Sequence, residues 1–301
     1  MVKSSEMADN VITPALPIAE AGRLIMANEL ATVQSHWPAL RLSADVTAVH
    51  ETRKALRRTF TLFKIFAPYF APGTLARQHD ELRRVMRRLA PCRDVAVFRV
   101  KLAAYNEAAE RPLHNLADYW GYRQMRADES LRDFLNRKST MRLMDRFGHL
   151  AMTTGAGLPE HHDKTAPLLV RHVLPGLIFH RLGDVRAWGE ILPTATPKQF
   201  HQLRIQFKEL RYTLSFFEEI ISAGGILEIS KRIQETLGDL NDASVAIDLL
   251  KEMEHLREET AIYAGYQRAE LERLMGEFRP LYAEFDRPKL RRELAVAMAN
   301  L

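Results

Sequence analysis

The chain has 301 residues, of which 47% are hydrophobic and 27% are charged, with 14 glycines and 14 prolines. A chain of this length and composition buries a substantial core, which excludes a disordered or a fibrous protein. The single cysteine, Cys92, excludes an intrachain disulfide framework, and no run of 18 apolar residues indicates a membrane span. The first thirty residues show no secretory signal, so we expect a cytoplasmic protein without a membrane partner.

The charge is unevenly distributed along the chain. There are 43 Lys and Arg against 38 Asp and Glu, a net charge of +5, but residues 50–101 alone carry 13 basic against 4 acidic side chains. The other 249 residues therefore have a net charge of −4. A solvated helix surface is one interpretation of such a basic region, and a site for a polyanion is the other.

The predicted elements are almost all helices, because good helix formers dominate and apolar residues recur every three or four positions. Turn-forming residues mark the breaks, among them Ala90-Pro91 and Gly238-Asp239, and Thr196 and Pro197 are predicted to begin a helix. We expect helices near residues 17–35, 45–68, 73–90, 92–110, 113–127 and 128–150, then near 163–190, 196–221, 226–237, 241–258, 260–285 and 288–299.

An internal repeat organises the chain. His50 and His201, 151 positions apart, are each followed by Arg at +3, an apolar residue at +6 and a basic residue at +7. A second pair, Asp94 and Asp242, follows at a spacing of 148. Two motifs that recur in order predict two copies of one helical unit, each with enough helices for a four-helix bundle. We divide the chain into a flexible N-terminus (1–12), a first bundle (13–152), a linker (153–162) and a second bundle (163–301), which together form one domain.

Basic residues follow one face of the helices in each copy. An α-helix turns about 100° per residue, so the four basic residues that begin at His201 fall on a stripe about 80° wide. The helix that follows in the sequence carries basic residues in a similar pattern. In the second copy, Glu235 and Thr236 replace two of these basic residues, so we expect more positive potential from the first half. The first stripe comprises His50, Arg53 and Arg57, widened by Lys54 and Arg58, and its next helix carries Arg83, Arg84, Arg87 and Arg88; the second comprises His201, Arg204, Lys208 and Arg211, and its next helix carries Lys231 and Arg232.

The spacing of these basic residues itself indicates an anion. Like charges at i,i+4, such as Arg53 with Arg57, destabilise a helix by a few tenths of a kcal/mol per pair, and an anion would neutralise that repulsion. The planar fork of arginine donates two parallel hydrogen bonds to phosphate oxygens. Asp94 and Asp242 are predicted to begin the helix that follows each basic helix, where the helix dipole favours a carboxylate; the alternative is that they orient a motif arginine.

These motifs resemble the CHAD family, the conserved histidine α-helical domain. The resemblance covers roughly residues 45–290 and rests on the first histidine motif, the motif from His201 to Tyr212, Arg93-Asp94-Val95 and the stretch from Leu237 to Asp242. It implies two four-helix bundles related by pseudo-two-fold symmetry, with the basic faces lining a central pore or groove. It further implies binding of inorganic polyphosphate and recruitment to polyphosphate granules, where other granule-associated proteins are potential partners. The resemblance implies as binding residues His50, Arg53, Arg57, Arg58, Arg84, Arg88, His201, Arg204, Lys208, Arg211, Tyr212, Lys231 and Arg232. The predicted binding set adds Lys54, Arg83 and Arg87 from the basic stripes.

Two other classes of function bind or act on anions, namely enzymes of phosphate chemistry and nucleic-acid modules. The Glu-x-Glu-x-Lys triplet of the triphosphatases often joined to this family does not occur, nor does a phosphate-binding loop, so we expect no enzyme and no cofactor. His79-Asp80 and His162-Asp163 resemble the metal-binding pair of helical phosphohydrolases, but adjacent residues on a helix diverge, so no metal site is predicted. Nucleic acid is the remaining alternative, at most bound non-specifically, because the stripes offer few aromatic side chains for base stacking.

Overall fold

The protein is described from a computed structural model, which places residues 11–158, 168–251, 253 and 256–301. These residues form α-helices and short 3₁₀ turns, which confirms the predicted all-α class, and no helix among them is long and apolar enough to cross a membrane. The first half contains α1 (Ile18–Ser43), α2 (Val46–Phe66), α3 (Thr74–Ala108), α4 (His114–Leu135) and α5 (Lys138–Met152), and the second contains α6 (Val170–Arg186), α7 (Pro197–Phe216), α8 (Gly224–Leu250), α9 (Arg257–Phe285) and α10 (Pro288–Ala299).

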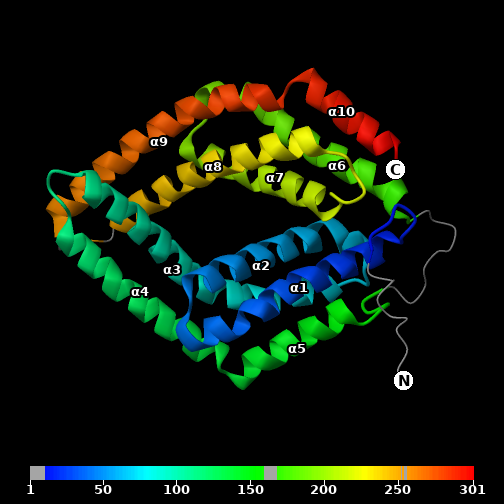
Figure 1. The fold of residues 1–301 in the computed structure, drawn as a ribbon, viewed down its shortest axis with the longest axis horizontal. Coiled ribbons are helices and arrows are strands. Elements are labelled where there is room, and N and C mark those ends of the chain that lie inside the picture. Colours follow the sequence, from blue (N-terminus) through cyan, green and yellow to red (C-terminus); the bar gives the residue numbers. More distant parts are fainter. Residues whose placement is uncertain (1–10, 159–167, 252, 254–255) are drawn as a thin grey trace.

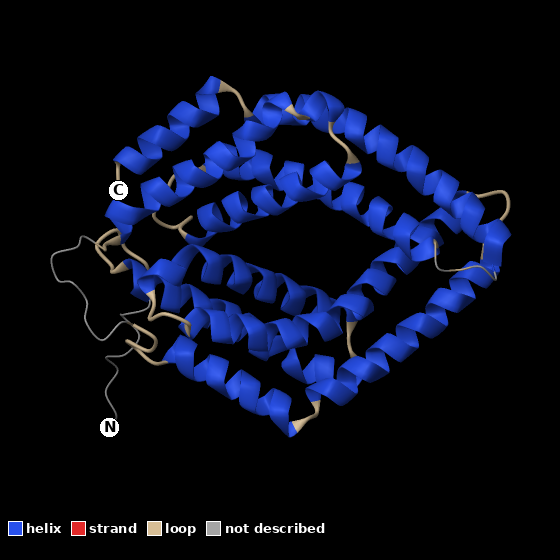
Figure 2. Ribbon diagram, turned by 180° about the vertical axis from the view of Figure 1, so that it is seen from behind, coloured by secondary structure: helices blue, strands red, loops and turns tan. Residues whose placement is uncertain are grey.

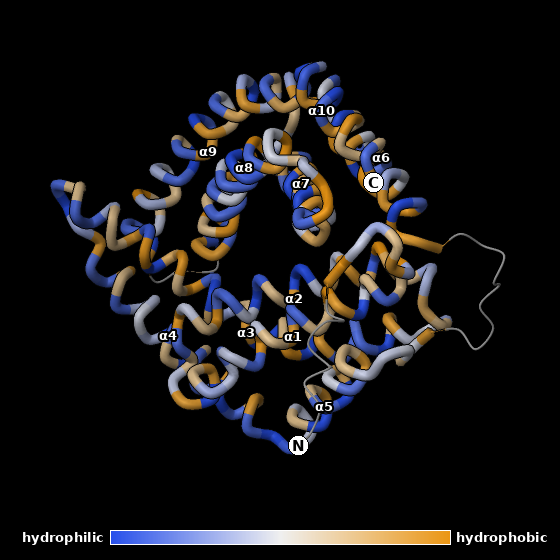
Figure 3. The backbone as a smooth tube through the Cα atoms, turned by 45° about the vertical axis from the view of Figure 1, so that its right-hand side comes forward, coloured by the Kyte–Doolittle hydropathy of each residue, from blue (hydrophilic) through white to orange (hydrophobic). Residues whose placement is uncertain are grey.

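The two halves lie opposite each other, with α2 and α7 facing inward (Figure 1). From behind, the same arrangement shows α1–α5 on one side and α6–α10 on the other (Figure 2). At one end α2 and α7 contact each other, and at the other end α3 and α4 meet α8 and α9. Polar and apolar residues alternate along the helices (Figure 3), as expected of amphipathic helices that each bury one face.

Contacts between equivalent residues of the two copies define a pseudo-two-fold relation. The amide of Ile18 donates to the carbonyl of Leu168 over 2.7 Å, and the amide of Val170 donates to the carbonyl of Leu16 over 2.9 Å. Each residue lies 152 positions from its counterpart in the other copy (170 − 18 and 168 − 16). The donor comes from the first half in one bond and from the second half in the other, so the two bonds are equivalent contacts with the halves exchanged. Such reciprocal pairing is the signature of a two-fold axis.

The crossing of α2 and α7 follows the same relation. Arg58 donates to Ser215 over 2.8 Å, and Lys64 pairs with Glu209 over 2.6 Å. The two pairs are equivalent, since both members are related by a shift of 151 residues (209 − 58 and 215 − 64). Arg58 in the first copy thus corresponds to an acidic residue in the second, so the symmetry of the fold is not a symmetry of charge.

Two hydrophobic clusters hold the halves together. The larger one runs through both halves and includes Phe66 and Phe217, whose rings stack with centroids 6.3 Å apart. The smaller one joins α3 and α4 to α8 and α9 through Phe98, Trp120 and Tyr263. Phe98 lies 4.6 Å from the Trp120 ring and 5.3 Å from the Tyr263 ring. These contacts place α3 of the first half next to α8 of the second.

Several predicted helix boundaries are wrong. The expected breaks at Pro91 and Gly238 do not occur, because α3 and α8 run continuously through both residues. Proline inside a helix costs about 3 kcal/mol, but here buried residues such as Leu89 and Cys92 flank the exposed Pro91, so packing outweighs the local preference. Similarly, α4 continues past residue 127 to Leu135, because Leu131 and Leu135 extend its buried face.

Other boundary predictions agree with the structure. Thr196 accepts a hydrogen bond from the amide of Gln199 in a capping box, and Pro197 occupies the first turn of α7, which confirms the predicted start. Residues 1–10, part of the predicted flexible N-terminus, and residues 159–167, which include part of the predicted linker and His162-Asp163, lie outside the described residues. The division of the chain into 1–12, 13–152, 153–162 and 163–301 stays a prediction.

Close packing of α1 on α2 predicts that Gly22 does not accept a side chain. A Cβ there would lie 2.7 Å from Phe66 Cδ1. We expect Gly22→Ala to lower the free energy of unfolding by about 1–3 kcal/mol, measured by chemical denaturation. Gly183→Ala is the matched control, because a Cβ at that helical position meets nothing within 4 Å, and it should raise stability by about 0.5–1 kcal/mol. Equal effects of the two substitutions would contradict this packing.

Candidate anion-binding site

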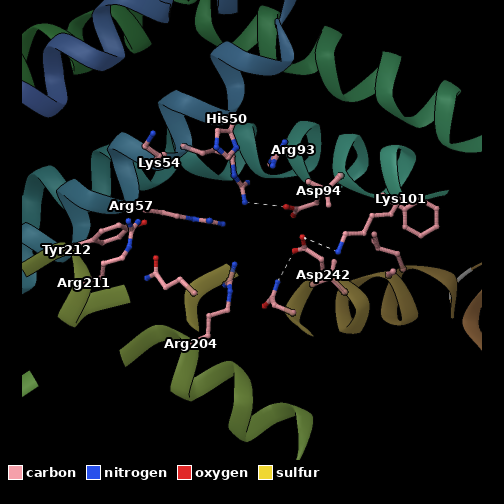
Figure 4. Close-up of a pocket in the computed structure, with 18 of the residues that line it drawn as sticks. His50, Lys54, Arg57, Arg93, Asp94, Lys101, Arg204, Arg211, Tyr212 and Asp242 are labelled. Carbon is pink, nitrogen blue, oxygen red and sulfur yellow. Dashed lines mark hydrogen bonds and ion pairs between the residues drawn. The ribbon is translucent and has the colours of Figure 1, made fainter. Parts of the chain in front are cut away.

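A cavity of about 310 Å³ lies where α2, α3, α7 and α8 come together (Figure 4). Helices of both halves contribute cationic side chains to it, so it is shared between the two copies of the repeat. Its lining comprises His50, Arg53, Lys54 and Arg57 of α2; Arg93, Asp94, Val97, Phe98 and Lys101 of α3; Arg204, Arg211 and Tyr212 of α7; Gln234, Asn241, Asp242, Val245, Ala246 and Leu249 of α8; and Tyr263 of α9.

The cavity side of α2 is set by the spacing of its basic residues. Asp45 caps the helix by accepting from the amide of Ala48 over 2.8 Å. From that start, residues 50, 53 and 57 fall on one side of the helix. Arg53 is only 6% exposed, and its Nη2 donates to Asp94 Oδ1 over 3.2 Å. Its Nε and Nη1 are buried with no hydrogen-bond partner among the described residues.

The cavity side of α7 repeats this arrangement. Arg204 and Arg211 line the cavity, and the Nε of each is buried without a partner in the described part of the chain. The guanidinium of Arg211 lies 5.2 Å from the centroid of the Tyr212 ring, so the aromatic face holds it in place. Buried donors without acceptors cost free energy. Donors from both halves therefore converge on a space that lacks the acceptors to satisfy them.

The pKa values of the basic side chains at the cavity are lowered by burial and by the positive charges of their neighbours. Burial, reinforced by the charge of Arg57, lowers the pKa of Arg53 to about 10. Burial also lowers the pKa of Arg204, again with a contribution from Arg57. Burial together with Arg204 and Arg57 lowers the pKa of Lys208 to about 6. The site therefore holds more positive charge than its own carboxylates neutralise, which a multiply charged anion would correct.

His50 and Arg93 lie close enough for the charge of Arg93 to act on the imidazole of His50. Burial and the charge of Arg93 lower the pKa of His50, so His50 becomes positively charged only at a pH below the range that is usual for histidine. The pKa of Arg93 is lowered by burial. His201, the counterpart of His50, does not line the cavity, and its exposed ring donates from Nδ1 to Asn241 Oδ1 over 2.8 Å. The two motif histidines thus have different surroundings.

Asp94 and Asp242 act inside the cavity and not at helix ends. Because α3 and α8 are continuous, the interpretation of these carboxylates as N-terminal residues is wrong. The alternative is confirmed for Asp94, which bonds the motif residue Arg53. Burial raises the pKa of Asp94 despite Arg53. Asp242 lies 3.7 Å from Lys101 Nζ, so each carboxylate holds a cation at the cavity wall.

The structure brings seven of the predicted binding residues together at the cavity, and Lys208 lies against them, since its charge interacts with Arg204, Arg57 and Arg53. The seven are His50, Arg53, Lys54, Arg57, Arg204, Arg211 and Tyr212. Together with Lys208, they bring most of the two stripes predicted from the sequence to one shared space, whereas His201 and Arg58 do not line it.

Other predicted residues are engaged elsewhere. Arg58 lies at the crossing of α2 and α7, where it pairs with Glu29 over 2.5 Å and stacks over Phe216 at 4.8 Å. Arg88 lies over the Phe134 ring of α4, and Arg232 pairs with Glu284 of α9 over 2.9 Å. Helix geometry explains this, because residues 88 and 232 point away from the cavity side of α3 and α8.

The remaining predicted residues are exposed outside the cavity, namely Arg83, Arg84, Arg87 and Lys231. Arg83 lies 18 residues before Lys101, five full helical turns, so it has the same direction on α3. By the same geometry, Lys231 points in nearly the direction of Asp242 on α8. These two residues continue the basic surface along α3 and α8 beyond the cavity.

Sequence reasoning left Arg93, Lys101, Gln234 and Asn241 out of the predicted binding set, although all four line the cavity. Arg93, Val97 and Lys101 are spaced by four, a helical signal that would have placed them on one face. The assumed break at Pro91 concealed this relation to the basic residues before it. In the described residues, no three His, Cys, Asp or Glu side chains come close enough to hold a metal ion.

Comparisons with known proteins agree with this fold. Residues 24–251 match the CHAD domain family, and the chain belongs to that family. Its fold is similar to the crystal structure of the CHAD domain from the plant Ricinus communis, with a TM-score of 0.73, 22% identity, and coverage of 96% of this chain and 95% of that one. It is also similar to PptA from Streptomyces chartreusis, with a TM-score of 0.70, 15% identity, and coverage of 89% of this chain and 100% of that one. No curated protein sequence matches the chain.

Proposed function

We propose that this protein binds inorganic polyphosphate in the cavity shared by its two halves, without catalysing its conversion. The observation that carries the proposal is the convergence of buried arginine donors without acceptors from α2 and α7, namely those of Arg53, Arg204 and Arg211. Membership of the CHAD family supports it, since that resemblance implies polyphosphate as the ligand.

The chemistry of the ligand matches the donors. Successive phosphate groups present oxygens at short intervals, and guanidinium groups bond two such oxygens at once. A flexible chain that contacts Arg53 of one half is held close to Arg204 of the other. The second contact then forms at high effective concentration, so the joint affinity exceeds that of either half.

The proposal extends to the location of the protein. We propose that the protein is cytoplasmic and that binding to polyphosphate places it on polyphosphate granules, next to other granule-associated proteins. We expect a fluorescently tagged chain to colocalise with granules in cells that contain them. A diffuse signal in such cells would contradict the granule assignment while leaving the binding itself open to direct measurement.

Salt dependence tests whether the binding is ionic. Five arginines, Arg53, Arg57, Arg93, Arg204 and Arg211, line the cavity. If they contact a similar number of phosphates, affinity should fall by roughly 10²- to 10³-fold between 50 and 200 mM salt, as counterion release no longer drives binding. Titration of long-chain polyphosphate at both concentrations measures this, and an affinity independent of salt would contradict the proposal.

Competition separates polyphosphate from nucleic acid. RNA of equal phosphate content should displace bound polyphosphate only weakly, because the cavity wall offers no exposed aromatic surface on which bases stack: its aromatic residues, Phe98, Tyr212 and Tyr263, are buried. Equal competition by RNA would favour a non-specific nucleic-acid module.

A hydrolysis assay tests whether the protein is an enzyme. Incubation of the protein with polyphosphate should release no orthophosphate, and release that depends on the cavity arginines would show an enzyme instead.

A further inference from the structure

The cavity has a second chemical character that a phosphate chain does not use. Beyond its arginines, one wall is formed by Val97 of α3 together with Val245 and Leu249 of α8. All three side chains are partly exposed, whereas Phe98 and Tyr263, which also line the cavity, are buried. The wall is therefore an accessible apolar surface beside a cluster of cations.

This wall is built from both copies of the repeat. Val97 and Val245 are equivalent residues, since they are 148 positions apart like Asp94 and Asp242. Each lies about one helical turn beyond its carboxylate, on the same helix face as Arg93 or Gln234. The two valines thus line the same part of the cavity from opposite halves, next to the cationic part.

An inorganic phosphate chain gains nothing from such a wall. A charged oxygen beside an aliphatic side chain loses water without gaining a hydrogen bond, which costs free energy. A ligand that suits both parts carries several phosphates at one end and a flat, mostly apolar group at the other. Nucleoside polyphosphates have this composition, and a cavity of about 310 Å³ lies within the size range of small-molecule sites.

Polar groups with spare hydrogen-bonding capacity also line the cavity. Gln234 Nε2 is buried in the cavity wall without a partner in the described part of the chain. Asn241 is held by His201, and its Nδ2 reaches Asp242 only at 3.5 Å, so that amide group also has donor capacity left. Sugar hydroxyls and base nitrogens or carbonyls are acceptors for such amides.

We propose that the cavity binds nucleoside triphosphates, with the phosphates on the arginines of α2 and α7 and the base between Val97 and Val245. This inference rests on the proposed function, because it uses the same cationic part of the cavity. It adds that the apolar wall selects a phosphate ligand that carries a base.

The experiment compares adenosine triphosphate with inorganic tripolyphosphate by calorimetric titration in magnesium-free buffer. Both have three phosphates, and tripolyphosphate carries at least as much negative charge, so a purely ionic site prefers tripolyphosphate. We expect adenosine triphosphate to bind the unaltered protein about 10-fold more tightly. Equal or weaker binding of adenosine triphosphate would overturn the inference while leaving the proposed function intact.

A double variant locates the preference. Val97→Ser with Val245→Ser should weaken adenosine triphosphate by about 10-fold and leave tripolyphosphate unchanged. The matched control is Val100→Ser with Val296→Ser, which makes the same changes at side chains 69% and 62% exposed outside the cavity, and it should alter neither ligand. Equal losses of both ligands in the cavity variant would overturn the role of the wall. If the unaltered protein binds neither these two ligands nor long-chain polyphosphate, the proposed function itself fails.

Discussion

Neutralising Arg53, Arg57, Arg204 and Lys208 together should lower the affinity for long-chain polyphosphate by at least about 100-fold. These four residues come from both halves, and the charges of the first three act on Lys208 in the free protein. Charge-assisted hydrogen bonds contribute about 1.5–3 kcal/mol each, so even partial loss of four exceeds a factor of 100. The variant Arg53→Gln, Arg57→Gln, Arg204→Gln, Lys208→Gln is titrated at two salt concentrations.

The control replaces the same number of basic residues elsewhere. Arg268, Arg273, Lys289 and Arg292 lie exposed on α9 and α10, outside the cavity. Replacing all four with Gln lowers the net charge at pH 7 at least as much, because Lys208 is largely neutral in the free protein, and we expect less than a 10-fold loss, attributable to the weaker overall field. Helical content, followed by circular dichroism, should survive in both variants, because the cavity substitutions relieve repulsion between like charges and the control residues are exposed. Equal losses in the two variants would mean that net charge alone binds the ligand, and the shared site would have to be abandoned.

Lys208→Met should stabilise the protein and weaken the binding of polyphosphate. Burial and two neighbouring arginines lower the pKa of Lys208 to about 6, far below the value of about 10.4 in an unfolded chain. At pH 7 the unfolded state therefore binds a proton that the folded state does not, so Lys208 costs stability. Methionine fills a similar volume without charge, and the free energy of unfolding should rise by about 0.5–2 kcal/mol while affinity falls about 10-fold.

The sign of the pH dependence follows from the same pKa. The loss of folding stability caused by Lys208 is absent above about pH 10.5, grows as the pH falls toward 6, and is constant below pH 6. The stability difference between the Met variant and the unaltered protein should therefore shrink as pH rises from 7 to 10, which denaturation at several pH values measures. A stability difference that does not change with pH in this range would show that the pKa of Lys208 is not lowered in the folded protein.

Binding should also be linked to proton uptake. A polyanion beside Lys208 raises its pKa, so the unaltered protein should take up about one proton on binding at pH 7. Calorimetry in two buffers with different ionisation enthalpies measures this number. The Met variant should take up fewer protons, and an unchanged uptake would assign the proton to another group, such as His50, whose pKa is also lowered.

Stability and binding are opposed in this site. The unpartnered donors of Arg53 and Arg204 and the crowded Lys208 are costs to the folded protein without ligand. A bound anion stabilises the folded state, because it supplies hydrogen-bond acceptors to these donors and negative charge to offset the cations. Polyphosphate should therefore protect the protein against unfolding more than it protects the quadruple variant.

The residues that the sequence placed correctly are those whose direction depends on one helix alone. Arg53 with Arg57, and Arg204 with Arg211, reach the cavity because the helical period sets their common face. Arg88 and Arg232 have similar spacing and composition, but they lie against Phe134 and Glu284 on neighbouring helices. No property of a single helix distinguishes the stripe that faces the cavity from one that faces α4 or α9.

The amino-acid sequence by itself determined the helical class, the duplicated motif and the basic faces of α2 and α7, because periodicity and repetition are local properties of the chain. Only the tertiary structure decided that α3 and α8 continue through Pro91 and Gly238, since burial on both sides of these residues outweighs their local preference. That continuity brings Arg93, Lys101 and the valine wall to the arginines. A site shared by two copies exists only once long-range packing, through the α2–α7 crossing and the cluster around Phe98, has set their mutual position.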